Sequence, residues 1–372
     1  MPRINSYLTP PASNETVQKT AEELELPPQT TEEKARRALS HAIQHTGALD
    51  QYVLHRVIGF GANGVVIGAE QLTNEGFFEP VAIKIIYKPS VFRNSIAPTN
   101  KDPVPNEIKI LRNMTLDPHA GLLRYITDYQ DRRNYYLVTE LFGTDWIALT
   151  KSIRNSSGVK ANSDTDAIPP LHAINPRSGL EIVVPFSSGS ADLWAWCYFE
   201  RCVAWSHGSA ATTKLPVPVI KQIAFQSLCA LTHLHERLGI FHADIKVENL
   251  LLAITDNQDG KGEDNYNVAV RVCDFGHSDR LSVGMKHIGT VGNASPELVA
   301  NESKKGVDGA KADVFALGVL VMKLLDSSGA FENEDYNQRE VELVDSLLKG
   351  MMEENPVQRM TMRQALEHAW FQ

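Results

Sequence analysis

The sequence FHADIKVENLLL, at residues 241–252, places a base, a cation and an amide within six residues between apolar flanks. Asp244 can accept a proton from a hydroxyl group, Lys246 can neutralise a moving phosphate, and Asn249 can offer its side-chain oxygen to a divalent cation. A second carboxylate for a metal, Asp274, follows in the sequence VCDFG at residues 272–276. Phosphoryl transfer requires these groups, because that reaction depends on positioning and charge neutralisation rather than on covalent chemistry. The stretch therefore predicts a catalytic loop.

The motifs His-Ala-Asp-x-Lys-x-x-Asn and Asp-Phe-Gly stand in the order found in eukaryotic protein kinases, and the sequence resembles that family. Because short motifs also arise by chance, each needs support from the rest of the chain. The resemblance covers residues 50–371 and implies an α+β fold with two lobes. It predicts a small, mainly β N-lobe with one helix at about 50–139, a hinge at 140–143, and a larger, mainly α C-lobe at 144–371.

The sequence GFGANG, at residues 59–64, lies between two stretches rich in β-formers. A dinucleotide-binding fold is the first alternative, but there the glycine turn must open a helix. Here Val65-Val66-Ile67 follows, and its β-branched side chains resist a helix. The loop is therefore predicted to join two strands and to cover phosphates. Glycine suits this position because the backbone must come close to the phosphate oxygens.

Lys84 stands alone in the apolar run VAIKII at residues 81–86. By itself it could be an exposed residue of an alternating strand. After the glycine loop, it resembles the kinase lysine that binds the α- and β-phosphates. Its partner in the family is a helix glutamate, and Glu107 fits the family's Glu-x-x-x-Leu pattern.

The sequence YYLVTELFG, at residues 135–143, resembles the last N-lobe strand and the hinge. The resemblance places Thr139 at the gatekeeper position and the backbone of Glu140 to Phe142 beside the adenine edge. The predicted nucleotide-binding residues are Gly59, Gly61, Gly64, Val66, Ala82, Lys84, Thr139, Glu140, Phe142 and Leu251.

The family mechanism implied is transfer of the ATP γ-phosphoryl group to a protein hydroxyl, with Mg²⁺ held by Asn249 and Asp274. The pattern Asp-x-Lys-x-x-Asn accompanies serine/threonine specificity in the family, and the motifs are most similar to the calcium/calmodulin-dependent kinase group. The predicted catalytic residues are Lys84, Glu107, Asp244, Lys246, Asn249, Asp274 and Thr290.

Three further motifs agree with the resemblance. Ser295-Pro296-Glu297 resembles the end of an activation segment, and Arg359 is the family's partner for that glutamate. Asp313 opens a run that resembles the buried helix whose aspartate holds the catalytic loop, and Thr361-x-x-Gln364 is predicted to cap a last helix.

Regulation by activation-loop phosphorylation is not expected. Ala243 stands where most regulated kinases have an arginine that pairs with a phosphate, and the usual phosphosite position holds Lys286. The sequence therefore predicts activity without that modification. The alternative is a pseudokinase that serves as a scaffold, which the presence of Lys84, Asp244, Asn249 and Asp274 disfavours.

The interval between the hinge and the helix predicted at Pro218 is far longer than in most kinases, and residues 151–217 are predicted to be an insertion. Ser, Asn, Gly and Pro clusters predict a loop at 151–190. Either residues 143–146 or residues 190–194 could begin the helix after the hinge.

The first 29 residues are rich in Pro, Ser, Thr, Glu and Gln and are predicted to be a disordered tail. Thr30 and Glu33 then form a capping-box pattern, which predicts an amphipathic helix within residues 30–49. This helix is expected to pack on the neighbouring lobe, and the alternative is that it, or the insertion, docks a partner.

Composition limits the other classes of function. The net charge of −9 disfavours nucleic acid as a partner. Four cysteines without a Cys-x-x-Cys pair, and no apolar leader, favour an intracellular protein of the cytoplasm or nucleus. The longest apolar run, at 312–325, is too short to span a membrane and is predicted to be a buried helix.

Overall fold

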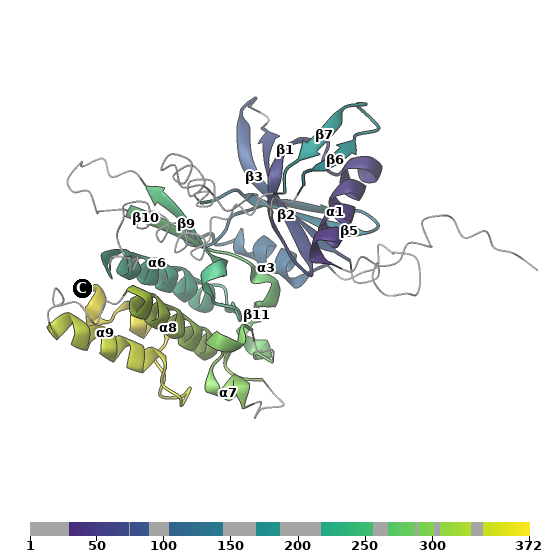
Figure 1. Cartoon of the computed structure of the whole chain (residues 1–372). Helices are drawn as coiled ribbons and strands as arrows, with labels where there is room; N and C mark the ends of the chain where they lie inside the picture. Colours follow the sequence, from purple (N-terminus) through teal and green to yellow (C-terminus); the bar gives the residue numbers. More distant parts are fainter. Residues whose placement is uncertain are drawn as a thin grey trace, which may run out of the picture.

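The computed structural model describes residues 30–73, 75–88, 104–143, 169–186, 217–255, 267–286, 289–300, 306–328 and 338–372. A β-rich part built mainly from the first half of the chain lies above a helical part built from the second half (Figure 1). The predicted tail and both candidate starts of the helix after the hinge lie outside the described residues.

An antiparallel sheet of five strands forms the β-rich part, in the order β1-β2-β3-β5-β4. The strands are β1 Tyr52–Phe60, β2 Gly64–Leu72, β3 Phe78–Tyr87, β4 Tyr125–Gln130 and β5 Asn134–Glu140. Side chains alternate between the two faces of a strand. Val65, Ile67, Val81, Ile83 and Ile85 are therefore buried together on one face. The opposite face is turned towards the helical part.

The helix predicted near the N-terminus is α1, Thr31–His41, and it ends in a π-helical turn, η2, Ala42–Thr46. Thr30 and Glu33 form the predicted capping box. Ala35 and Leu39 are fully buried in the same hydrophobic cluster as the sheet residues Val65, Ile67, Val81, Ile83 and Ile85. The prediction that this helix packs on the neighbouring lobe is confirmed.

The prediction of a loop throughout residues 151–190 is wrong for its second half. Residues 171–184 form a hairpin of β6, Leu171–Ile174, and β7, Glu181–Val184. Ala173 and Val184 bury one face of the hairpin in the core above the sheet. The alternation in each strand is too short to stand out from the Ser-, Pro- and Gly-rich sequence around it. The hairpin therefore joins the β-rich part, although it follows the hinge in the chain.

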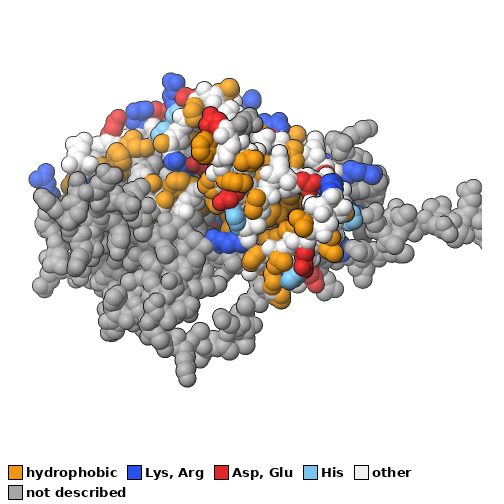
Figure 2. Space-filling model, turned by 90° about the horizontal axis from the view of Figure 1, so that it is seen from above, with side chains coloured by type: hydrophobic (Ala, Val, Ile, Leu, Met, Phe, Trp, Pro, Cys, Tyr) orange, Lys and Arg blue, Asp and Glu red, His pale blue; other side chains and the backbone are white. Residues whose placement is uncertain are grey.

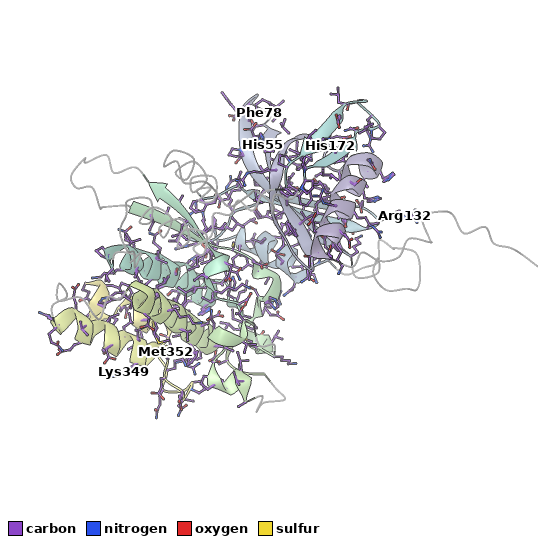
Figure 3. The ribbon with its side chains drawn as sticks, in the orientation of Figure 1. His55, Phe78, Arg132, His172, Lys349 and Met352 are labelled. Carbon is purple, nitrogen blue, oxygen red and sulfur yellow. The ribbon has the colours of Figure 1, made fainter. Side chains whose placement is uncertain are left out.

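The outer surface of the β-rich part carries apolar side chains interspersed with charged ones (Figure 2). His55 of β1, Phe78 of β3 and His172 of the hairpin lie at this end of the molecule, whereas Lys349 and Met352 lie in the helical part (Figure 3).

The helical part contains α6 Val217–Glu236, α7 Pro296–Val299, α8 Gly309–Ser328, α9 Gln338–Met351 and α10 Met362–Leu366. The shorter helix α3, Asn106–Met114, lies between it and the sheet. Leu231 of α6 and Leu317 of α8 are fully buried, and the predicted buried helix at 312–325 is confirmed as part of α8. None of the helices in the described ranges is long and apolar enough to cross a membrane.

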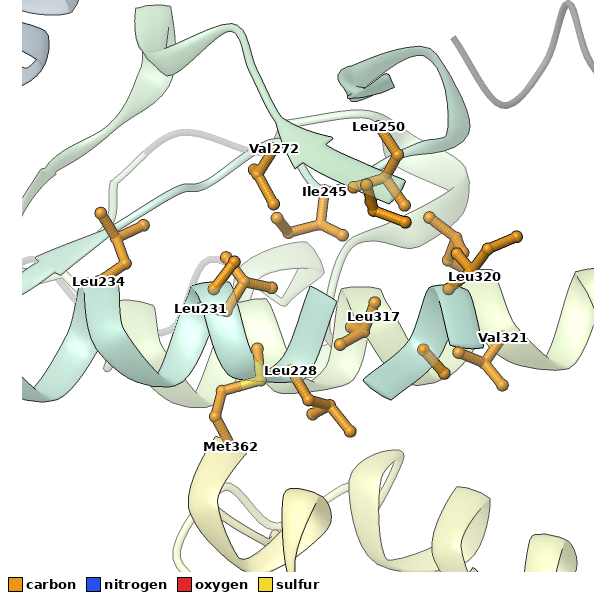
Figure 4. Packing of buried hydrophobic residues seen from close by; sticks show 14 of the residues in the cluster. Leu228, Leu231, Leu234, Ile245, Leu250, Val272, Leu317, Leu320, Val321 and Met362 are labelled. Atoms are coloured by element: carbon orange, nitrogen blue, oxygen red, sulfur yellow. The ribbon is translucent and has the colours of Figure 1, made fainter. Parts of the chain in front are cut away.

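Two small two-stranded sheets sit on these helices. β9, Leu250–Thr255, pairs with β10, Asn267–Val272, and β8, Ile240–Phe241, pairs with β11, Asp279–Arg280. Ile245, Leu250 and Val272 pack directly on α6 and α8 (Figure 4). The largest core thus lies immediately beneath the predicted catalytic loop.

In the helical part, a buried ion pair joins α7 to the segment just before α10. Both terminal nitrogens of Arg359 donate to the Glu297 carboxylate, at 2.7 and 2.9 Å, and Arg359 is only 1% exposed. The pairing predicted from the sequence is confirmed. Burial would raise the pKa of Glu297, but the hydrogen bonds from Arg359 lower it below its usual value of 4.5.

We expect Glu297→Gln to lower the free energy of unfolding by about 3 kcal/mol, because it leaves a buried guanidinium without its counter-charge. Urea denaturation at neutral pH measures this loss. The lowered pKa means that the wild-type contribution is fully present above pH 4.5 and is lost as the pH falls further.

Glu367→Gln is the matched control, because Glu367 is largely exposed and lies 3.9 Å from Arg363. It should change stability by less than about 0.5 kcal/mol. Equal effects of the two substitutions would contradict the role assigned to the buried pair.

Candidate active site

Asp244 is the centre of the predicted catalytic loop. Its Oδ1 accepts hydrogen bonds from the Thr290 backbone N–H at 3.0 Å and from the Thr290 hydroxyl at 2.8 Å. Its Oδ2 lies 2.7 Å from Lys246 Nζ and accepts a 3.2 Å hydrogen bond from Asn249 Nδ2. The structure therefore brings four of the seven predicted catalytic residues into direct contact.

The charges around Asp244 favour its ionised form. Burial alone would raise its pKa, but hydrogen bonds from Lys246 and Thr290 lower it below the ordinary value. The pKa of Lys246 is raised, since Asp244 outweighs the effect of burial. At neutral pH the site thus holds a carboxylate and an ammonium group side by side.

Asn249 is oriented by the backbone of the same loop. Its Nδ2 donates to the Asp244 carbonyl oxygen at 2.7 Å, so Oδ1 is the atom that the side chain can offer to a cation. The Asn249 carbonyl also accepts a 3.0 Å hydrogen bond from the Cys273 N–H. Because Asp274 is the next residue, the β9–β10 hairpin carries an amide oxygen and a carboxylate to the same end.

Lys84 joins the sheet to the helical part. Its Nζ lies 2.8 Å from Glu107 Oε1 of α3 and 2.9 Å from Asp274 Oδ1. Burial would lower the pKa of Lys84, but the two carboxylates outweigh burial and raise it. Lys84 in turn lowers the pKa of Asp274. The three residues form one network of ion pairs that links β3, α3 and the residue pair following β10.

Asp313 of α8 fixes the backbone of the catalytic loop from below. It is 1% exposed and accepts hydrogen bonds from His242 N–H at 2.6 Å, Ala243 N–H at 2.8 Å and His235 Nε2 at 2.9 Å. Ala243 has a φ of 69°, a conformation that non-glycine residues seldom adopt. The buried aspartate therefore stabilises the turn immediately before Asp244, and the prediction that Asp313 holds this loop is confirmed.

The glycine loop turns between β1 and β2, and no helix follows it. This excludes the dinucleotide-binding alternative. A Cβ at Gly64 would lie 2.5 Å from the Ile85 carbonyl, so only glycine fits there, whereas Gly59 and Gly61 have open space around them. Val66 pairs with Lys84 across the sheet, and Ala82 lies two residues away on the same face. The loop and these side chains thus line one surface.

The hinge residues predicted from the sequence lie at the end of β5. Thr139 is buried and pairs with Ala82. The N–H groups of Glu140 and Leu141 donate to other backbone carbonyls. Among the three N–H groups of residues 140–142, that of Phe142 has no such backbone partner within the described ranges. That the backbone of Glu140 to Phe142 lies beside the adenine edge stays a prediction.

Arg271 is a residue of this region that the sequence analysis missed. Its guanidinium donates to Glu140 Oε1 at 3.0 Å and lies 4.5 Å from the ring centre of Phe142. It thereby ties β10 to the hinge. The sequence feature that could have pointed to Arg271 is that it is the single charged residue in the otherwise mostly apolar stretch NVAVRV at residues 267–272. Leu251, the remaining predicted residue, pairs with Arg271 in the same hairpin.

Comparison with known proteins places this geometry in context. Residues 196–371 match the protein kinase domain family. Over 336 residues the chain is 26% identical to the serine/threonine-protein kinase ppk6 of Schizosaccharomyces pombe, covering 86% of this chain and 33% of that protein. The α+β fold predicted from the sequence is confirmed.

Plant kinases are similar as well. The chain is 24% identical over 340 residues to CBL-interacting protein kinase 19 of Oryza sativa, with 87% of this chain and 51% of that protein covered. It is 32% identical over 151 residues to calcium-dependent protein kinase 25 of Arabidopsis thaliana, with 36% and 27% covered. The chain thus spans between about a quarter and a half of the length of these relatives. They agree with the predicted similarity to the calcium/calmodulin-dependent group.

We expect Asp313→Asn to lower the free energy of unfolding by about 2 kcal/mol, because either orientation of the amide turns its NH₂ group towards a buried N–H donor. Urea denaturation measures the loss. The control is Asp308→Asn, since Asp308 is exposed, accepts from the first N–H groups of α8, and asparagine caps helices equally well. Similar stability of both variants would contradict the role given to Asp313.

Proposed function

The chain carries a protein kinase domain and is a distant homologue of serine/threonine kinases, and from this premise we propose that it transfers the γ-phosphoryl group of ATP to serine or threonine side chains of a protein. The observation that carries the proposal is the contact of Lys84 with both Glu107 and Asp274. Kinases need this lysine–glutamate pair and the metal-binding aspartate in place together. This contact supports a site assembled for phosphoryl transfer.

The residues present fit a magnesium–nucleotide complex. Mg²⁺ prefers oxygen ligands, usually one or two protein oxygens together with phosphate oxygens and water. Asn249 Oδ1 and a carboxylate oxygen of Asp274 would supply the protein oxygens. When bound, Mg²⁺ would neutralise charge on the phosphates. Lys84 would hold the α- and β-phosphates, and the open space over Gly59 and Gly61 allows the backbone of the loop to approach them.

Asp244 would orient the acceptor hydroxyl and take its proton. Asp244 is ionised at neutral pH and can therefore accept a proton, and the hydrogen bonds from Lys246 and Thr290 favour this ionised form by lowering its pKa. Thr290 fixes one carboxylate oxygen and leaves Oδ2 on the side of Lys246. Lys246 would neutralise charge on the group in transfer. Together these residues account for positioning, deprotonation and charge neutralisation.

Asp244→Asn should lower kcat for a serine or threonine peptide about a thousandfold, because the amide cannot accept the proton. Binding of Mg–ATP should change little, since within the described ranges Asp244 contacts the predicted metal ligand Asn249 but none of the predicted nucleotide-binding residues. A radiolabel transfer assay measures the first quantity, and titration calorimetry measures the second.

The control is Asp345→Asn on α9, where Asp345 is exposed and pairs with Lys349 on the surface. It should retain full turnover. Undiminished turnover of the Asp244 variant would refute the assignment of the base. A wild-type protein that binds ATP but phosphorylates no member of a peptide library would refute the proposed activity and favour a nucleotide-binding scaffold.

We further propose that the activation segment is held by apolar packing rather than by a phosphate. Met285 is buried against Phe241, Ala243, Leu298 and Ala312 in a small separate cluster. Its backbone exchanges two 2.9 Å hydrogen bonds with Val307. Ala243, at the position where a phosphate-binding arginine would stand, is itself part of this cluster.

The packing continues to the catalytic loop. A Cβ at Gly289 would collide with the Ala243 carbonyl, so the segment lies in close contact with the loop just before Thr290. Lys323 Nζ donates to Asn293 Oδ1 at 2.7 Å and supports the segment on the other side of Thr290. These contacts support a segment that needs no added charge to hold its position. Lys286 is exposed beside Met285.

Protein made in a bacterial host and treated with a phosphatase should therefore show the same kcat as untreated protein. Met285→Asp should lower kcat at least about tenfold, because it buries an unpaired charge beneath the segment. The same change at exposed Val283 should have little effect. Turnover that appears only after an upstream kinase is added would contradict the proposal.

A further inference from the structure

The segment after the hairpin covers the open edge of the sheet. β1 is an edge strand, and its Val57 forms a parallel bridge with Phe186. The Val57 N–H donates to the Pro185 carbonyl at 2.8 Å. An unpaired strand edge leaves backbone groups without partners. Residues 185–186 therefore fix β1 only a few residues before it enters the glycine loop.

Phe186 connects three parts of the molecule. It is 5% exposed and belongs to the core that α1 and the sheet share. One of its ring contacts is with Phe60, at 5.9 Å between centroids. Phe60 stands between Gly59 and Gly61, so a residue of the inserted hairpin segment supports a residue of the glycine loop.

Arg36 of α1 holds Phe186 in place. Its guanidinium carbon lies 4.3 Å from the centre of the Phe186 ring. The same guanidinium donates to the carbonyl oxygens of Pro169 and Pro170, at the start of the hairpin segment. Its Nε also pairs with Glu32 one turn earlier on α1, at 2.7 Å. The N-terminal helix thus ties down both ends of the segment.

A second set of contacts holds the turn of the hairpin to the residues between η2 and β1. Asn175 Nδ2 donates to Asp50 Oδ1 at 2.9 Å, and Arg177 lies 3.2 Å from the other Asp50 oxygen. Gly47 has a φ of 66°, and a Cβ there would collide with the Arg177 guanidinium. The hairpin is therefore held at its turn and at its two ends.

We propose that Phe186 is a positioning residue for nucleotide binding, which acts by holding Phe60 and thereby ordering the glycine loop before ATP arrives. The inference rests on the proposed kinase activity. No neighbouring atom lies within 4 Å of the position that a Cβ would take at Gly59 or Gly61. The contact between Phe60 and Phe186 therefore restrains a part of the loop that is open on its other side. A loop that is ordered in advance loses less conformational freedom when a ligand binds. The contact with Phe186 therefore favours ATP affinity rather than the transfer step.

The test is Phe186→Leu, which keeps an apolar side chain in the core but removes the aromatic contact. We expect the Kd for Mg–ATP and the KM for ATP to rise about fivefold, the size expected from loss of one aromatic pair. The kcat at saturating ATP and the KM for the peptide should stay within about a factor of two, because saturation orders the loop again.

Phe60→Leu and the double variant show whether Phe186 acts through Phe60. If it does, the double variant should bind ATP no more weakly than the weaker single variant. Effects that multiply would overturn the proposal. Phe60 is about one-third exposed, so Phe60→Leu also tests the contact if Phe186→Leu proves unstable.

The control is Ile174→Ala, on the exposed face of the same hairpin, which should bind ATP as the wild type does. A purely structural role for Phe186 would lower the fraction of active protein, and hence kcat, without changing the Kd. That result would overturn the inference but not the proposed function. So would an unchanged Kd for Mg–ATP in Phe186→Leu, provided that the wild-type protein binds and uses ATP. A wild type that does not bind Mg–ATP would overturn the proposed function.

Discussion

The ammonium group of Lys84, set between two carboxylates, is the interaction on which the rest of the site depends. Lys84 comes from the sheet, Glu107 from α3, and Asp274 from the end of the β9–β10 hairpin. The buried carboxylate of Glu107 would be costly without a counter-charge, and Lys84 supplies that charge while also pairing with the partly exposed Asp274. This single contact therefore fixes the sheet, α3 and the hairpin relative to one another.

The predicted catalytic loop is held by the helical part, through the hydrophobic core of α6 and α8 and through Asp313. Ile245 and Leu250 are buried in the core that α6 and α8 form (Figure 4). Asp313 accepts hydrogen bonds from the backbone N–H groups of His242 and Ala243, just before Asp244. A rigid core thus supports the loop, while its polar side chains point towards one another around Asp244. The apolar cluster of Met285 and the buried Arg359–Glu297 pair continue this support under the activation segment.

Much of this arrangement could be predicted from the sequence, because the functional residues lie in short motifs whose chemistry is local. The β-branched residues after Gly64 decide between a strand and a helix, and the Thr30–Glu33 spacing marks the start of α1. The hairpin at 171–184 could not be predicted, because its strands are only four residues long and are stabilised by burial against distant elements. Arg271 was missed for the same reason, since its partners lie on the hinge and only the fold brings them together. The roles of Phe186 and Met285 likewise depend on packing between segments far apart in the chain.

The most direct test of the account is a crystal structure of the protein with Mg²⁺ and a non-hydrolysable ATP analogue. The account predicts a metal ion at about 2.0–2.1 Å from Asn249 Oδ1 and an Asp274 carboxylate oxygen. It also predicts that Lys84 Nζ contacts the phosphates and that the glycine loop covers them. A nucleotide bound elsewhere, or a metal ion held by neither Asn249 nor Asp274, would contradict it.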